Sequence, residues 1–308
     1  MLRERSSAGA GRSATGLRWA AVTAVVSGFA IWVNRFGVAA WSEAGGSLPY
    51  TTAKNLVAAT VLIGMLLALS RHTEGASTAR RHWRGLLAVA VVGGGIPFAL
   101  FFEGLSRATS AQAAFIHKTL VLWVAAMAIP LLGEKVKGFH FAAIGLLIVG
   151  QIALAGGVAG ITVGAGEMMI LIATLMWSIE VIIAKRLLGD VRPLEVGVAR
   201  MAGGAAVLVL IGLFNGSFGS LAALGWSQIG WVAVTGVALS AYVFTWMNAL
   251  SLAPATDVTA VLVGSVIVTS LLEGGPVGLV GAAAPGLALI AVGVALVLLR
   301  PRPAAEHV

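Results

Sequence analysis

Ionisable side chains inside long apolar stretches are the residues of this 308-residue chain that could carry chemistry. A charged group at the centre of a membrane helix costs roughly 2.5–3.5 kcal/mol on insertion scales, so it usually faces a cavity or a partner. The basic members of this set outnumber the acidic ones, which favours carboxylate or phosphate ligands over organic cations. The set consists of Arg35, Lys54, Glu103, Lys118, Glu180 and Arg200.

Lys118 is the most informative of them. It lies about eight residues into an apolar stretch, a depth of roughly 12 Å on a helix. The position predicts an ammonium group that binds an anionic substrate, or one that exchanges a proton. The alternative is a structural ion pair with Glu103 across the short polar turn at 106–110. The neighbouring His117 points about 100° away on a helix, so it is either a second site residue or a packing residue.

The other charged candidates have simpler alternatives. Glu103 could line a cavity or pair with Arg107 four residues later. Arg35 lies near the end of its stretch, so it either faces the passage or extends to the membrane interface, and the same holds for Lys54. Glu180 and Arg200 either line the passage or form a structural ion pair with each other.

Uncharged polar and flexible residues complete the candidate set. Trp32 and Trp177 could stack on a substrate, and Asn34 could bind its polar groups. Gly93–Gly95 stand just before Pro97 in the middle of an apolar stretch, and proline removes a backbone hydrogen bond there. The sequence therefore predicts a kink or hinge at this point.

The composition identifies the elements that must position these side chains. Hydrophobic residues make up 59% of the chain, charged residues 10%, and the mean hydropathy is +0.98, whereas soluble domains carry about 25% charged residues. Since a span needs about 20 apolar residues, the chain is expected to be an all-α integral membrane protein with ten transmembrane helices. The predicted spans are 18–40, 51–70, 85–106, 111–132, 138–157, 166–187, 195–214, 228–250, 257–273 and 278–299.

The basic residues predict the orientation of these spans. Most of the 20 Lys and Arg residues fall in segments on one side when ten spans alternate, and that side is the cytoplasmic one. We therefore expect both termini inside, in the inner (plasma) membrane of a bacterium, with a disordered basic arm at 1–17 and a tail at 300–308. This topology accounts for the net charge of +8, so no nucleic-acid partner is predicted.

An internal repeat divides the chain into 18–157 and 166–299. A shift of 145 residues aligns Trp32 with Trp177 and Leu105 with Leu250. Each repeat would hold five spans, and an odd number reverses the orientation of the second repeat. Inverted repeats of this kind occur in secondary transporters, which bind substrate near the midplane and open to alternate sides.

Four segments resemble the EamA-type ten-helix members of the drug/metabolite transporter superfamily. They are residues 32–35 (WVNR), 101–111 (FFEGLSRATSA), 130–135 (PLLGEK) and 249–255 (ALSLAPA). The resemblance covers about residues 18–299, and it implies a multi-pass transporter of small molecules.

No phosphate-binding loop, HExxH or CxxC motif occurs, and the chain has no cysteine. The sequence therefore predicts no cofactor, no metal and no enzymatic activity. We expect a secondary active transporter, an exporter or exchanger, of small anionic or zwitterionic metabolites, with amino acids or other carboxylates favoured and protons as a coupling ion. The alternatives are proton-coupled efflux of cationic drugs and, less favoured, an intramembrane enzyme. The predicted site comprises Lys118, Trp32, Asn34, Arg35, Trp177, Glu180, Arg200, His117 and Glu103.

Overall fold

The fold is a bundle of long apolar helices. The computed structural model describes residues 2–42, 45–70, 77–157, 164–219, 224–275, 279 and 281–299, and within these ranges helices and turns occur without any strand. The expected tail at 300–308 lies outside the described residues.

The first part of the chain forms five helical runs, two of them interrupted. The third run contains a π-helical turn, η2, and the fourth is divided at Thr119. The elements are α1 (Leu2–Trp41), α2 (Ser47–Ser70), the 3-10 turn η1 (Ala79–His82), α3 (Trp83–Val89), η2 (Ala90–Gly95), α4 (Ile96–Leu105), α5 (Ser110–Lys118), α6 (Leu120–Leu132) and α7 (Gly138–Leu154).

The second part also forms five runs. The second of them contains a π-helical turn, η4, and the fourth is divided at Gly264. The elements are α8 (Ala165–Leu187), α9 (Pro193–Val198), η4 (Ala199–Gly203), α10 (Gly204–Phe214), α11 (Trp226–Leu252), α12 (Ala255–Val263), α13 (Ser265–Gly274), the 3-10 turn η7 (Gly281–Ala283) and α14 (Ala284–Leu298).

Nine of the helical runs in the described ranges are long and apolar enough to cross a membrane. The remaining run, α7, has 17 residues and is about 26 Å long at 1.5 Å per residue, somewhat less than the hydrocarbon core of about 30 Å. The sequence therefore located the helical runs correctly, and the tenth span remains a prediction.

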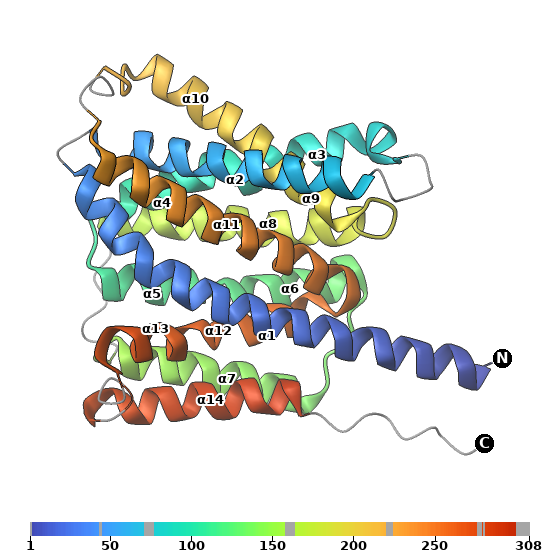
Figure 1. The fold of residues 1–308 in the computed structure, drawn as a ribbon. Coiled ribbons are helices and arrows are strands. Elements are labelled where there is room, and N and C mark those ends of the chain that lie inside the picture. Colours follow the sequence, from blue (N-terminus) through green and yellow to red (C-terminus); the bar gives the residue numbers. More distant parts are fainter. Residues whose placement is uncertain are drawn as a thin grey trace.

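The start of the first helix differs from the expected disordered arm at 1–17. In the structure α1 is helical from Leu2, and its first turns extend beyond the rest of the bundle (Figure 1). The segment 2–17 holds three Arg and three Ala, which favour a helix, beside three Ser and three Gly, which do not. Its helix is therefore a continuation of the apolar span and is not explained by composition alone.

The two parts of the chain pack on each other in a reciprocal way. The first helix, α1, packs mainly on α11, α12 and α13 of the second part, and α8 packs mainly on α3 to α6 of the first.

The pair α7 and α14 lies side by side at one edge of the bundle (Figure 1). Gly150 and Gly286 form the closest point of this pair, because a Cβ on either would lie within 2.8 Å of the other's carbonyl oxygen. Small residues commonly allow such close packing in membranes.

Two spans are interrupted at positions that the 145-residue shift relates. Thr119 separates α5 from α6 with φ −64° and ψ −9°, and Gly264 separates α12 from α13 with φ −58° and ψ −15°. At both points the amide donates to the carbonyl three residues earlier, at 3.1 Å from Thr119 to Ile116 and 3.0 Å from Gly264 to Val261. Each span therefore consists of two half-helices joined by one tighter turn.

Candidate functional site

Two π-helical turns meet near the middle of the bundle. The turns η2 and η4 pack directly on each other, and a Cβ on Gly94 would clash with the Arg200 carbonyl and lie 3.0 Å from the Gly204 Cα. A π-turn leaves carbonyls outside the normal helical pattern, and two side chains bind them. Trp177 Nε1 donates to Gly93 O at 2.9 Å, and Asn55 Nδ2 donates to Gly94 O at 3.3 Å. The predicted interruption before Pro97 is therefore present.

The ion pair between Glu180 and Arg200, one of the two predicted alternatives for these residues, lies beside this crossing. Arg200 Nε is 3.5 Å from Glu180 Oε1, and the two side chains are 5% and 1% exposed. Among the described residues, neither these two atoms nor Arg200 Nη1 has a hydrogen-bond partner. A buried pair normally requires close hydrogen bonding to offset its desolvation. This one retains unused donors and an unused acceptor.

Aromatic rings surround Trp177. Their ring centroids lie 5.4 Å away for Phe98, 5.3 Å for Phe101 and 5.0 Å for His117. The contacts bring α8 together with α4 and α5. The structure thus unites two predicted site residues, Trp177 and His117, and the buried Nδ1 of His117 has no hydrogen-bond partner in the described part of the chain.

Lys54, on α2, is buried against a second set of aromatic rings. Its Nζ lies 4.0 Å from the ring centroid of Phe102 and 5.2 Å from that of Tyr50. It also donates to Asn34 Oδ1 at 3.1 Å, and the same oxygen accepts from the Tyr50 hydroxyl at 2.8 Å. The ion pairs of the described residues do not include Lys54. Its charge is therefore held by a neutral amide and by cation–π contacts.

Phe98 connects the two sets of residues. The Arg200 guanidinium lies 5.8 Å from its ring centroid, and Lys54 Nζ lies 5.9 Å from it. Two buried cations, one from each part of the chain, thus lie near one ring. We call Lys54, Phe98, Trp177, Glu180 and Arg200 the basic–aromatic cluster.

Sequence analysis left Lys54 undecided between the site and the interface, and it did not identify Phe98 or Phe102. The charge inside an apolar stretch was the available signal for Lys54. No pattern in the sequence indicates which rings pack around it.

Lys118 joins the two interrupted spans. It is the last residue of α5, and its buried Nζ donates to the hydroxyl of Ser265, the first residue of α13, at 2.8 Å. The predicted alternative, an ion pair with Glu103, is wrong. Glu103 instead pairs with Arg107 at 2.5 Å, and both side chains are about half exposed. The residue four positions along the turn is within reach of Glu103, whereas Lys118 lies deeper in its span.

Trp32 and Arg35 lie apart from this cluster. Trp32 packs against the edge of Phe36 at 5.3 Å, and Trp177 is not among its ring contacts in the described residues. Arg35 is half exposed, and its Nη1 lies 3.6 Å from Glu273 Oε1. The structure therefore brings together Trp177, His117, Glu180 and Arg200, and links Asn34 to them through Lys54. It does not bring in Arg35 or Glu103.

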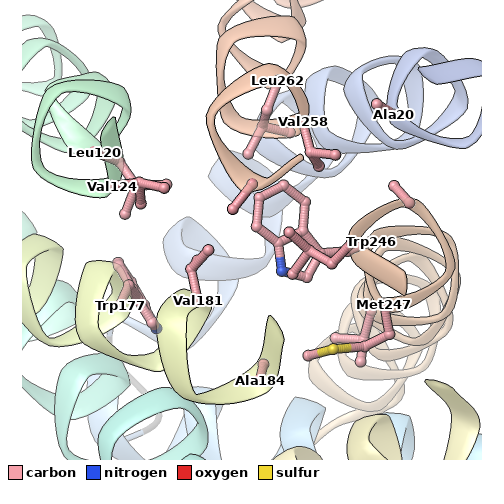
Figure 2. Close-up of a cluster of buried hydrophobic side chains, with 14 of the residues drawn as sticks. Ala20, Leu120, Val124, Trp177, Val181, Ala184, Trp246, Met247, Val258 and Leu262 are labelled. Atoms are coloured by element: carbon pink, nitrogen blue, oxygen red, sulfur yellow. The ribbon is translucent and has the colours of Figure 1, made fainter. Parts of the chain in front are cut away.

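A cluster of buried apolar side chains lies next to these residues. Figure 2 shows Val181 of α8 and Trp246 and Met247 of α11 gathered with side chains of α6 and α12 in one buried cluster. On α8 and α6 these residues follow Trp177 and Lys118, and on α12 they precede Ser265. We call this set the apolar plug, and its labelled members are Ala20, Leu120, Val124, Val181, Ala184, Trp246, Met247, Val258 and Leu262.

The arrangement defines a class: a helical membrane protein with buried cations and aromatic rings between two interleaved sets of spans. Residues 14–156 match the EamA-like transporter family. This part of the chain is therefore similar to EamA-type members of the drug/metabolite transporter superfamily, which are multi-pass membrane transporters of small molecules.

The fold is shared with a solved structure, described only as the crystal structure of a protein. It has a TM-score of 0.71 and 19% sequence identity, and the match covers 92% of this chain and 96% of that one. No curated protein matches the chain significantly. Among the described residues, no three His, Cys, Asp or Glu side chains gather in a way that could hold a metal.

Proposed function

We propose that this protein is a secondary active transporter of small organic anions or zwitterions, with amino acids or other carboxylates as the favoured substrates. The observation that carries the proposal is the pair of buried cations near Phe98. Lys54 and Arg200 approach the ring from different parts of the chain, and Glu180 is the acidic residue of the cluster. The cluster therefore has a net positive charge that a bound carboxylate would neutralise.

Lys54 is the leading residue for this role. An ammonium group has three N–H donors, and the hydrogen bond to Asn34 uses one of them. Hydrogen bonds between an ammonium and a carboxylate are roughly twice as strong as neutral ones. A substrate carboxylate would thus accept the remaining hydrogen bonds of the Lys54 ammonium group and neutralise its charge, which Asn34 and the aromatic rings do only in part. Lys118, whose Nζ donates to the Ser265 hydroxyl at 2.8 Å, remains a second candidate.

The rings provide the surface for the rest of the substrate. Phe98, Phe101 and Trp177 meet edge to face or tilted. Substrate pockets are mostly apolar with a few polar groups that fix orientation. Trp177 is oriented by its bond to Gly93 O, so its indole would form a fixed wall of such a pocket.

Alternating access between two inverted five-helix repeats, 18–157 and 166–299, is the proposed mechanism. Reciprocal packing of α1 and α8 supports it, as do the matching interruptions at Thr119 and Gly264. Discontinuous helices commonly form the binding sites of secondary transporters. In the proposed topology both termini are cytoplasmic in a bacterial plasma membrane. A coupled proton would bind at Glu180, whose Oε1 has no hydrogen-bond partner in the described residues.

A ligand-stabilisation experiment tests the proposal. Purified protein would be heated with carboxylates, amino acids, sugar phosphates and organic cations, using wild type, Lys54→Met and Lys118→Met. Lys135→Met, at an exposed lysine of the 133–137 loop, is the matched control. We expect carboxylates or amino acids to stabilise wild type and the control. Lys54→Met should weaken the apparent affinity by about tenfold or more, the effect of losing a hydrogen bond to a charged group.

Two results would contradict the proposal. Stabilisation by carboxylates that is equal in wild type, Lys54→Met and Lys118→Met would exclude both lysines from the site. Stabilisation by organic cations alone would instead support efflux of cationic drugs, with Glu180 as the binding group.

A further inference from the structure

The end of the bundle nearest the apolar plug contains a helix cap that crosses between the two parts of the chain. Gly133 ends α6 in the left-handed conformation, with φ +67°, and the chain then presents Glu134. The Glu134 carboxylate accepts from the amide of Ala255 at 2.5 Å and from that of Thr256 at 3.0 Å. These are the first residues of α12, where backbone amides are unsatisfied and the helix dipole favours a negative charge.

A lysine holds the other side of the same connection. Lys185, in the last turn of α8, donates to the carbonyls of Leu250 at 2.5 Å and Ala253 at 2.8 Å. These carbonyls belong to the end of α11 and the turn after it, where a positive charge is favourable. The short connection between α11 and α12 is therefore fixed by two charged side chains: Lys185 donates to its carbonyls, and the Glu134 carboxylate accepts from its amides.

Two further contacts attach this region to the first part of the chain. His140 Nε2, near the start of α7, lies 3.1 Å from Asp257 Oδ1 in the first turn of α12, and both side chains are buried. Arg186 Nη2 donates to Leu131 O at the end of α6 at 2.7 Å. The start of α12 is thus fixed by the segment 133–140, directly beside the apolar plug.

At the opposite end of the bundle, the described cap of α5 comes from its own part of the chain, because the Thr109 hydroxyl accepts from Gln112 N at 3.3 Å. A described ion pair between the two parts at that end joins Arg35 to Glu273 at 3.6 Å, with both side chains half exposed. Exposed pairs of this kind contribute little to stability. Neutral hydrogen bonds also join the two parts at that end, from Trp41 Nε1 to Gln228 O at 3.2 Å and from Gln228 Nε2 to Ala40 O at 3.1 Å. The described contacts of the two ends therefore differ in kind, because charged groups bind the helix ends only beside the apolar plug.

We propose that Glu134 is the positioning residue that keeps this end of the transporter closed, and that release of its carboxylate from α12 opens the apolar plug during transport. The inference rests on the alternating access proposed above, and it does not depend on which substrate is carried. It explains why an anion from one part of the chain caps a helix of the other. A cap between parts that separate can be broken and remade in each cycle.

Cysteine labelling tests the role of Glu134 directly, because the natural chain contains no cysteine. Ala184, a plug residue on α8, and Ala173, on the same helix about 16 Å away at 1.5 Å per residue, are both 0% exposed. Each would be changed to cysteine in separate full-length proteins and reacted with a water-soluble maleimide. The measurement compares wild type, Glu134→Gln, and Glu273→Gln as the matched control at the opposite end.

We expect Glu134→Gln to raise the labelling rate at position 184 by about tenfold, the shift in an opening equilibrium that follows loss of a hydrogen bond to a charged group. Labelling at position 173 should stay slow, and Glu273→Gln should leave both rates unchanged. Equal rates at position 184 in wild type and Glu134→Gln would overturn the proposal. A rise at both positions in Glu134→Gln would also overturn it, since that marks general loosening.

The outcome is separable from that of the proposed function. Loss of thermal stabilisation by carboxylates in Lys54→Met tests the substrate site alone, and its result does not depend on the labelling rate at position 184. Conversely, plug opening in Glu134→Gln would support the closing role even if the substrate proved to be a cation.

Discussion

Gly94→Ala probes the crossing of the two π-turns, where the backbones of two spans approach closely. The added Cβ would meet the Arg200 carbonyl and the Gly204 Cα. Both are backbone atoms, so neither can rotate away as a side chain could. Overpacking of this kind costs typically about 1–3 kcal/mol, and rigid backbone places the cost near the top of that range. The helix-propensity gain of alanine offsets about 0.5–1 kcal/mol. We therefore expect a net loss of about 2 kcal/mol.

Thermal unfolding of the purified protein in one detergent measures this effect. Gly64→Ala is the matched control, because Gly64 lies within α2 and a Cβ there would have no atom within 4 Å. The control should unfold at a slightly higher temperature than wild type, whereas Gly94→Ala should unfold at a clearly lower one. If Gly94→Ala unfolds at or above the wild-type temperature, the two π-turns do not approach as described.

Two further substitutions test the buried polar contacts. Glu180→Gln leaves Arg200 as an uncompensated buried charge, so it should destabilise the protein by about 3–5 kcal/mol in thermal unfolding. The double variant Glu180→Leu, Arg200→Met should recover part of that loss, because it removes both charges. If the double variant shows no recovery, the ion pair is not present as described. Tyr50→Phe removes the hydrogen bond to Asn34 and should cost about 1 kcal/mol, measured in the same way, with an unchanged unfolding temperature counting against this bond.

The helical runs could be predicted from the sequence because each one is a long apolar segment in a chain with few charges. The kink at Gly93–Gly95 was also predictable, since Pro97 and three glycines act locally. The second π-turn, η4, was not, because residues 199–203 contain neither a proline nor a run of glycines. It is defined by its packing against η2, which is a tertiary contact.

The candidate site was predictable only in its charges. A lysine or arginine within an apolar stretch is visible in the sequence, but its partner is not. Lys118 bonds to Ser265, which is 147 residues away, and Lys54 lies among rings from α2 and α4. The ion pair of Glu180 and Arg200 was the exception. Their opposite charges lie at similar depths in neighbouring spans, and this limited the possible partners.

The reciprocal packing of α1 and α8 has a consequence for biogenesis. The surface on which α1 packs is formed mainly by α11, α12 and α13, which are synthesised after more than half of the chain. During insertion, residues 14–156 therefore have no complete core of their own, and α1 is in the bilayer before the helices on which it mainly packs have been synthesised. The native bundle can close only when the last spans arrive. Separately expressed fragments would need each other to acquire the native arrangement.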